Sequence, residues 1–278
     1  MKKIAVLLPV YKKDNPKYFA TTLDSLMAQT YQDFSIFLGV DGPIDGELEN
    51  AVKECEQNPK FCVCRFSANR GLACVLNDLI TEAQKQGFEY FARMDADDVC
   101  VDTRFEQQMN FLQNHPEVDV VGGAIEEVNE DGQKNGKKVS YPLTHEACRN
   151  FFRYRDPLAH PTTFFRKRFF DKIVKMNGRE NIWYRPEYRK NQDTMLWFDG
   201  FMSGCVFANL SNTVLNFRVA KDFYGRRNGW KRARQMMHSR MEINKAMNYD
   251  CSANFFAIAM ALMTISPTCI KKMLYKIR

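Results

Sequence analysis

The sequence predicts an α/β protein built on a doubly wound, mostly parallel sheet. Between residues 3 and 98, strand-length apolar runs alternate with amphipathic stretches of helical period, and the connections between them are short. Apolar residues make up 45% of the 278 residues, with 22 Phe among them, which is enough for a large core. A strand–helix alternation of this kind is typical of parallel sheets covered by helices on both faces.

The elements follow one another regularly in the first half. Strands are expected at 3–10, 34–40, 61–66 and 88–94, with helices at 16–29, 45–57 and 72–86. After them we expect a helix at 104–114, a strand at 118–122 and an exposed hairpin within 126–138. Gly122-Gly123 indicates either a close backbone approach, such as to a sugar, or a plain bulge. The later half is less regular, with strand-like runs at 162–165 and 214–217 and a helix beginning near 194.

Polar residues follow each of the first four strands. They are Tyr11 after Pro9, then Asp41, then Asn69-Arg70, and finally Asp95, Asp97 and Asp98. Parallel strands present their carboxyl ends at one edge of the sheet, where ligands of such folds bind. The sequence therefore predicts a nucleotide-plus-metal site at this edge, although each turn alone also fits an ordinary loop or helix cap.

The acidic cluster predicts the type of metal. Asp95 and Asp97 alternate along the chain and point the same way if the backbone is extended, whereas Asp98 faces elsewhere. Carboxylates without nearby His or Cys favour Mg²⁺ or Mn²⁺ over zinc. The alternative is a solvated acidic turn capping a helix near Asp102. Neither a Gly-x-Gly-x-x-Gly motif nor a P-loop is present, so we expect the metal to meet phosphate charge.

Six ordered motifs resemble those of family-2 inverting glycosyltransferases. They are residues 4–11, Val40-Asp41-Gly42, Asn69-Arg70-Gly71-Leu72 with Asn77, Met94-Asp95-Ala96-Asp97-Asp98, Ala159-His160-Pro161-Thr162, and Gln192-Asp193-Thr194-Met195-Leu196-Trp197. The resemblance covers roughly residues 3–220. It is closer to bacterial enzymes that extend O-antigen, capsule or exopolysaccharide repeats, and within them to those that add galactose to an N-acetylhexosamine on a lipid pyrophosphate.

The resemblance implies a GT-A fold and a UDP-sugar donor. Pro9 and Tyr11 would line the base pocket, and Asp41 would accept a hydrogen bond from uracil N3. Asn69 and Arg70 would lie beside the nucleotide. Asp95 would contact the ribose, or the metal through water, and Asp97 would hold Mn²⁺ or Mg²⁺ on the diphosphate.

Asp193 is the expected catalytic base. The family places the base in a Glu-Asp pair before Leu-Trp, and this chain has Gln192-Asp193, which keeps the second acid. An inverting transfer needs one base to take the proton of the acceptor hydroxyl. The alternative role for Asp193 is a helix N-cap.

Three further residues are expected near the acceptor or the diphosphate: His160, Trp197 and Arg218. For His160 a structural role is the alternative. Arg218 and the pair Arg226-Arg227 carry charge that suits a pyrophosphate, and a solvated basic loop is the alternative for them.

The C-terminal part differs in charge. The net charge is +7, but from Lys221 onward there are twelve Lys and Arg against three Asp and Glu. We therefore divide the chain into a glycosyltransferase domain, 1–220 (nucleotide half about 1–100, acceptor half about 101–220), and a basic helical tail, 221–278. Within the tail, 253–265 is apolar but too short to cross a bilayer, which takes roughly 20 residues. It predicts either an in-plane anchor on anionic lipid or a core helix under the sheet.

Composition limits the other classes. Nine cysteines without a Cys-x-x-Cys pair favour reduced thiols. The opening apolar run ends at Pro9, too early for an export signal. No aromatic-interleaved basic motif indicates a nucleic-acid partner.

We therefore expect a metal-dependent inverting hexosyltransferase on the cytoplasmic face of the membrane. It would transfer a sugar, galactose favoured, from UDP to a lipid-linked or glycan acceptor. The alternatives are a sugar-phosphate nucleotidyltransferase, which would need a glycine-rich loop after the first strand, and a catalytically silent scaffold.

Overall fold

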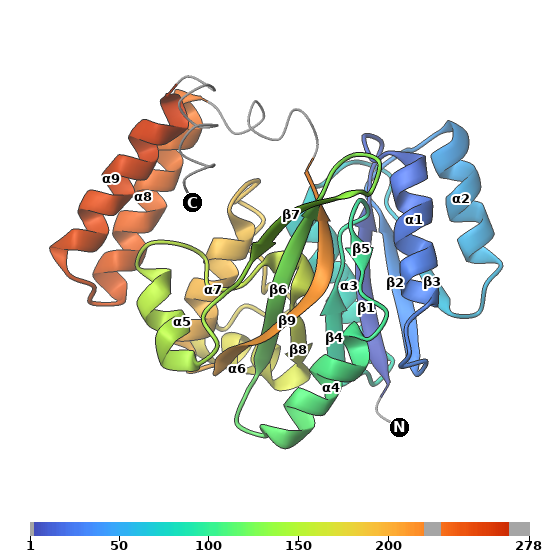
Figure 1. Ribbon diagram of the computed structural model, residues 1–278, viewed down its shortest axis with the longest axis horizontal. Helices are drawn as coiled ribbons and strands as arrows, with labels where there is room; N and C mark the ends of the chain where they lie inside the picture. The colour runs from blue at the N-terminus through green and yellow to red at the C-terminus, as the bar shows by residue number, and fades with distance from the viewer. Residues whose placement is uncertain (1–2, 220–228, 267–278) are drawn as a thin grey trace.

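A nine-stranded sheet forms the centre of the protein (Figure 1). The computed structural model describes residues 3–219 and 229–266. Strand order is β3-β2-β1-β4-β8-β6-β9-β5, with β7 paired to β6. The strands are β1 Ile4–Val10, β2 Phe34–Val40, β3 Phe61–Arg65, β4 Tyr90–Arg93, β5 Val99–Cys100, β6 Val120–Val128, β7 Lys134–Val139, β8 Phe164–Arg166 and β9 Phe207–Arg218.

The helices lie on both faces of the sheet and beyond its edge. They are α1 Pro16–Met27, α2 Gly46–Glu56, α3 Leu72–Lys85, α4 Arg104–Asn114, α5 His145–Phe152, the 3₁₀ turn η1 His160–Thr162, α6 Lys167–Asn177, α7 Gln192–Met202, α8 Trp230–Ala246 and α9 Cys251–Ile265. The predicted strand 34–40 and helix 104–114 coincide with β2 and α4. The strand predicted at 88–94 is shorter, because only Tyr90–Arg93 pairs with its neighbours.

Alternation along β1 builds two hydrophobic cores. Ile4, Val6 and Leu8 point to the side covered by α1, α2 and α4. Ala5 and Leu7 point to the opposite side, covered by α3, α6 and α7. Both sets are fully buried, which explains why β1 is apolar at nearly every position.

The first half of the sheet is parallel, as predicted. β1 pairs with β2 on one side and with β4 on the other, and β2 pairs with β3. Chain order therefore reverses between β1 and β4, which makes a topological switch point. Val10, Val40 and Arg65 are in register at the carboxyl ends, so the polar turns that follow these strands meet at one edge.

The second half is mixed. β8 is antiparallel to both β4 and β6, and β6 and β7 form the predicted hairpin. The register of β6 against β9 shifts next to Gly123. A Cβ on Gly122 would lie 2.3 Å from Asn209 Oδ1, and one on Gly123 2.6 Å from Val214. The glycine pair therefore accommodates a bulge and the side chains of β9, not a ligand.

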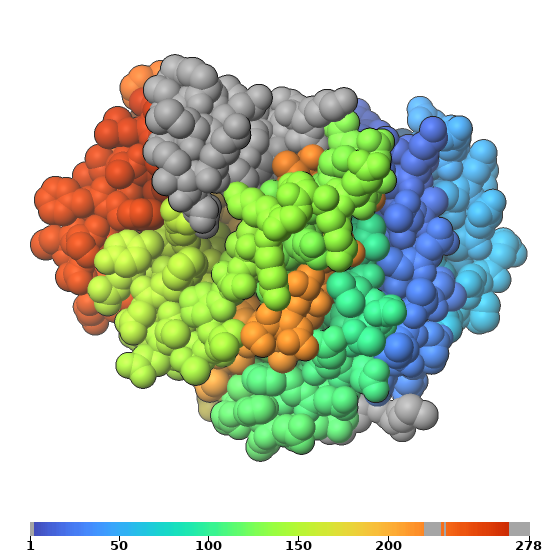
Figure 2. All heavy atoms as spheres, viewed as in Figure 1, coloured from blue at the N-terminus to red at the C-terminus, as the bar shows by residue number. Residues whose placement is uncertain are grey.

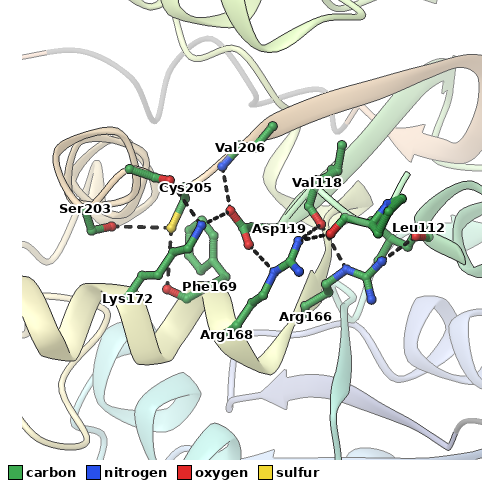
Figure 3. Close-up of polar contacts among 12 residues, drawn as sticks. Leu112, Val118, Asp119, Arg166, Arg168, Phe169, Lys172, Ser203, Cys205 and Val206 are labelled. Carbon is green, nitrogen blue, oxygen red and sulfur yellow. Dashed lines mark hydrogen bonds and ion pairs between the residues drawn. The ribbon is translucent and has the colours of Figure 1, made fainter. Parts of the chain in front are cut away.

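A buried ion-pair network fixes the amino end of β6 (Figure 3). Asp119 is fully buried, and its carboxylate contacts Arg168 and Lys172 of α6 at 2.5 and 2.7 Å. The N–H of Val206 donates to the same carboxylate at 2.7 Å. One side chain thus joins β6, α6 and the start of β9.

The hairpin α8–α9 stands beyond the edge of the sheet, at the left of Figure 1. Helix α9 packs against α8, with Ala253, Ala257 and Ala261 buried. The alternative of a core helix under the sheet is therefore wrong, because the small residues of α9 pack against α8 and not against the sheet. Within 3–219 and 229–266, no helix is long and apolar enough to span a membrane. Arg226, Arg227 and the residues after 266 lie outside the described residues.

The thiols agree with the expectation from composition. The eight cysteines in the described part of the chain are all free, and four of them are buried. Burial raises the pKa of Cys148 and Cys205 to about 12. These thiols therefore pack as small hydrophobic side chains.

Candidate active site

Asp41 joins the turns that follow β2 and β3. Its carboxylate accepts hydrogen bonds from the N–H groups of Arg70 (2.7 Å) and Gly71 (2.9 Å) and from Asn69 Nδ2 (2.9 Å). Gly42 has φ +88°, and a Cβ there would lie 2.7 Å from Asn69 N. The two turns are therefore locked together, and Asp41 is mostly buried between them. Oδ2 accepts two of these hydrogen bonds and Oδ1 one, so Oδ1 has capacity for one more donor.

The turn after β1 contains a carboxyl that the sequence analysis missed. Asp14 Oδ2 accepts a hydrogen bond from the N–H of Tyr11 at 2.8 Å. Burial raises the pKa of Asp14 to about 7, and the nearby charges of Asp97 and Asp95 also raise it. The hydrogen bond from Tyr11 N–H acts in the opposite direction and lowers this pKa. The first turn therefore brings a carboxyl next to the acidic loop after β4. In the sequence, Asp14 is marked only by its position in a turn just before the helix that begins at Pro16.

Buried arginines support the acidic loop. The guanidinium of Arg93, fully buried, contacts the carboxylate of Asp95, whereas the Asp97 side chain is exposed. Asp98 points away from both, as predicted: it is buried and accepts a hydrogen bond from Arg218 N at 2.9 Å. Burial raises the pKa of Asp98 well above its ordinary value. Arg93 had a signal in the sequence, a charged residue inside an apolar run.

The side chain of Arg218 donates to main-chain carbonyl groups and does not line the cleft. Its Nε donates to Asp97 O at 2.8 Å, and its Nη1 donates to Glu130 O at 2.7 Å. The side chain is buried, with its guanidinium 4.3 Å from the ring centre of Tyr18. This corrects the expectation that Arg218 meets a diphosphate: it fastens the acidic loop to the β6–β7 hairpin.

The acidic loop offers few protein ligands for a metal. No group of three or more His, Cys, Asp or Glu in 3–219 and 229–266 could hold an ion alone. Asp97 is exposed and Asp95 partly exposed. Mg²⁺ and Mn²⁺ suit such a site, because Mg²⁺ usually keeps waters and takes one or two carboxylates together with substrate phosphates. The oxygen donors present therefore fit the expected ion, provided a phosphate completes its coordination.

A cleft of about 810 Å³ joins the acidic loop to the second half of the protein. Asp95 of the acidic loop, His160 and Asp193 all line this cleft. Residues of α8 and α9 complete the wall: Met236, Ser239, Arg240, Phe256, Ala257 and Met260. The structure thus brings the predicted base and the first acid of the predicted metal site to one cleft.

Asp193 lies in the first turn of α7 and is half-buried. Its Oδ1 accepts a hydrogen bond from its neighbour, Thr194 N, at 2.9 Å. Burial raises the pKa of Asp193 to about 6, and nearby Asp156 raises it, while the hydrogen bonds of the helix start and Arg240 lower it. A carboxyl with a pKa near neutrality is suited to proton transfer at physiological pH.

His160 and Trp197 have different positions relative to the cleft. His160 Nε2 is 2.8 Å from Tyr184 Oη, and burial lowers the pKa of His160 well below its ordinary value, so the ring is neutral. Trp197 is fully buried, with its ring centre 6.0 Å from that of His160. This corrects the expectation that Trp197 contacts the acceptor: its indole packs behind His160 in the core.

Two further charged residues line the cleft beside the predicted base. Asp156 accepts hydrogen bonds from Thr194 Oγ1 at 2.9 and 3.0 Å, and Arg240 of α8 donates to it at 2.7 Å. Neither is predicted from the sequence, because Asp156 and Arg240 are 84 positions apart and neither lies in a motif.

The family model described as glycosyl transferase family 2 matches residues 5–174. The chain belongs to this glycosyltransferase family. It is 29% identical to the amylovoran biosynthesis glycosyltransferase AmsE of Erwinia amylovora, over 81% of this chain and 80% of that protein. It is 23% identical to the UDP-Gal:alpha-D-GlcNAc-diphosphoundecaprenol beta-1,3-galactosyltransferase of Escherichia coli, over 99% of this chain and 95% of that one.

The fold of this glycosyltransferase is confirmed by a solved structure. S. aureus TarS 1-349 in complex with UDP superimposes with a TM-score of 0.61 at 18% identity, covering 87% of this chain and 69% of that one. The GT-A fold implied by the sequence motifs is therefore present.

Proposed function

We propose that this glycosyltransferase is a metal-dependent, inverting hexosyltransferase acting in bacterial surface polysaccharide synthesis, of the O-antigen or capsule type. Its donor would be a UDP-sugar, with galactose favoured, and its acceptor a lipid-pyrophosphate-linked sugar or a glycan. The observation that carries the proposal is the shared cleft, which both Asp95 of the acidic loop and the half-buried Asp193 line. An inverting transfer needs the leaving diphosphate and the base in one cleft, with the sugar between them.

The residues have separate tasks in this mechanism. Pro9, Tyr11, Asp41, Asn69 and Arg70 would hold the nucleotide at the edge of the parallel strands. Asp97 and Asp95 would hold Mn²⁺ or Mg²⁺, which stabilises the charge that gathers on the leaving diphosphate.

On the other side of the cleft, Asp193 would take the proton of the acceptor hydroxyl as its oxygen attacks C1 from the face opposite the diphosphate. Neutral His160, fixed by Tyr184, would line the acceptor side without adding charge.

The relatives support the finer parts of the proposal. A UDP complex of a protein with this fold supports the donor nucleotide. The name of the E. coli relative supports galactose and a diphosphate-lipid acceptor, and that of the Erwinia relative supports polysaccharide synthesis. A lipid-linked acceptor would place the enzyme peripherally on the cytoplasmic face of the membrane.

Two substitutions test the division of roles. Asp97→Ala should abolish Mn²⁺-dependent UDP binding measured by calorimetry, because the ion loses its exposed carboxylate.

Asp193→Asn should keep UDP binding but lower transfer to a pyrophosphate-lipid acceptor by about 10²–10⁴-fold, the usual contribution of a general base. Asp102→Ala is the matched control, since it removes an exposed carboxylate a few residues further along. Unchanged transfer by Asp193→Asn would remove it as the base.

A further inference from the structure

A continuous chain of contacts connects helix α8 to the start of α7. Arg240 Nη2 donates to Asp156 Oδ1 at 2.7 Å, and Thr194 Oγ1 donates to both oxygens of Asp156. Thr194 follows Asp193 directly, and its N–H donates to the Asp193 carboxylate. Arg240, Asp156 and Thr194, from three separate parts of the sequence, thus form a chain that ends at the carboxylate of Asp193.

Arg240 is held firmly in this position. Its Nη1 donates to Phe152 O at 2.9 Å, and its guanidinium lies 5.0 Å from the centre of the Phe152 ring. Its side chain is 13% exposed and that of Asp156 30%. Because both charges are largely withdrawn from water, each acts on its neighbours with little screening.

We propose that Asp156 and Arg240 are positioning residues for Asp193, through which the hairpin α8–α9 sets the protonation of the base. Asp156 places a negative charge at the start of α7, where the helix dipole favours it, and Arg240 supplies the balancing positive charge. The tail is then part of the active site. This inference rests on the proposed role of Asp193 as the base.

The charges around Asp193 give the two residues opposite effects. Asp156 lies next to it, α8 contributes Arg240 and Arg232, and Tyr184 approaches from the segment before α7. His160 and Asp95 also line the cleft that Asp193 lines. A nearby negative charge opposes ionisation of a carboxyl, and a nearby positive charge favours it. Asp156 therefore raises the pKa of Asp193, and Arg240 lowers it.

The first test is the pH dependence of transfer. The base works only when deprotonated, so kcat/KM falls as the pH drops below the pKa of Asp193. Asp156→Asn should move this acidic limb to lower pH, and Arg240→Met should move it to higher pH, each by about 0.5–1 unit. Loss of structure alone would not produce opposite shifts.

Arg185→Met is the matched control. Arg185 pairs with Asp199 of α7 at 2.6 Å and lies 5.8 Å from the centre of the Phe198 ring. It therefore repeats the arginine–carboxylate–ring arrangement beside α7, the helix that carries Asp193. The control should lose stability without moving the acidic limb. Shifts in the same direction for Asp156→Asn and Arg240→Met, or shifts matched by Arg185→Met, would overturn the inference.

A second readout needs no substrate and separates this inference from the proposed function. A carboxyl whose pKa is raised by folding is protonated in the folded state while it is ionised in the unfolded state, so it costs stability as pH rises. The free energy of unfolding relative to Asp193→Asn should therefore fall between about pH 4 and pH 6.

The same two substitutions should move the window of that fall. The upper pH limit of the window should be lower when the Asp193→Asn comparison is made in the Asp156→Asn background. It should be higher when the comparison is made in the Arg240→Met background. An unmoved window would overturn the inference whether or not sugar transfer is observed. If the window moves while no sugar is transferred, only the proposed function fails.

Discussion

Asn77 shows how one buried side chain supports the acceptor side of the cleft. From α3, its Oδ1 accepts hydrogen bonds from Trp183 N (3.1 Å) and Tyr184 N (2.9 Å), and its Nδ2 donates to Tyr184 O (2.7 Å). Tyr184 in turn fixes His160. Asn77 belongs to the same sequence motif as Asn69 and Arg70, which are expected beside the nucleotide. Its side chain, however, supports the residues around His160.

Replacing Asn77 by Ala should lower the free energy of unfolding by about 3 kcal/mol, because three main-chain groups lose their partner in the interior. Transfer should fall more than UDP binding, since the damage lies behind His160. Chemical denaturation and calorimetry measure the two effects. Asn212→Ala removes an exposed amide bonded to Gln107 and should cost less than about 0.5 kcal/mol. Equal losses in the two variants would contradict this account.

At the scale of elements, Asp119 tests what holds β6 and β9 of the sheet to helix α6. Figure 3 shows its carboxylate between Arg168 and Lys172, with Val206 N on the same group. Replacing it by Ala removes the acceptor of the Val206 N–H and the carboxylate partner of Arg168 and Lys172, which are 41% and 36% exposed and can be hydrated. The loss should be about 1–3 kcal/mol, the usual result of leaving a main-chain donor without its partner. Urea denaturation should show this loss.

The control for Asp119→Ala is Asp171→Ala. It breaks the more exposed pair with Lys167 on the same helix α6 and should cost less than about 1 kcal/mol. A similar loss for both variants would mean that the buried network contributes nothing special.

Local patterns predicted most elements of the first half, and distant contacts decided the rest. Strand and helix periods predicted β1 to β4 and α1 to α4, but not the two-residue strand β5. Because parallel strands end at one edge of a sheet, Asp41 and Asp95 were expected where the structure places the turns after β2 and β4. Trp197 and Arg218 were misjudged because their burial depends on segments far along the chain. No local sequence pattern marks Asp156 or Arg240 as site residues. The two side chains meet near Asp193 only because α8 packs beside the cleft.

At the scale of the whole molecule, the hairpin α8–α9 has two different faces. Toward the body, Asp250 pairs with Arg153 at 3.0 Å, and Phe256 lies 5.1 Å from the Tyr154 ring; Figure 2 shows the hairpin surface meeting that of the α5 region. On the other side, Phe255, Ile258 and Leu262 are 72%, 38% and 58% exposed. Their spacing places them on one stripe of α9.

This stripe should bind a membrane surface. No charged residue occurs from Cys251 to Ile265, whereas α8 carries the exposed Arg234 and Lys245. This combination favours an in-plane helix on anionic lipid. Replacing Phe255, Ile258 and Leu262 by Ser should reduce co-flotation of the full chain with phosphatidylglycerol vesicles at least about tenfold, because each removes apolar surface from the lipid. Stability should change little, as these side chains are exposed.

The control variant replaces three exposed apolar residues away from α9, namely Leu143, Met176 and Met202, by Ser. It should float with anionic vesicles as the unmodified protein does, and neither should bind strongly to neutral phosphatidylcholine vesicles. Equal flotation of the α9 variant and the unmodified protein would exclude the stripe as the membrane contact. Because Phe256 and Met260, on the cleft side of α9, line the same wall as Asp193, a bound membrane would lie next to the cleft, where a lipid-linked acceptor could enter without leaving the bilayer.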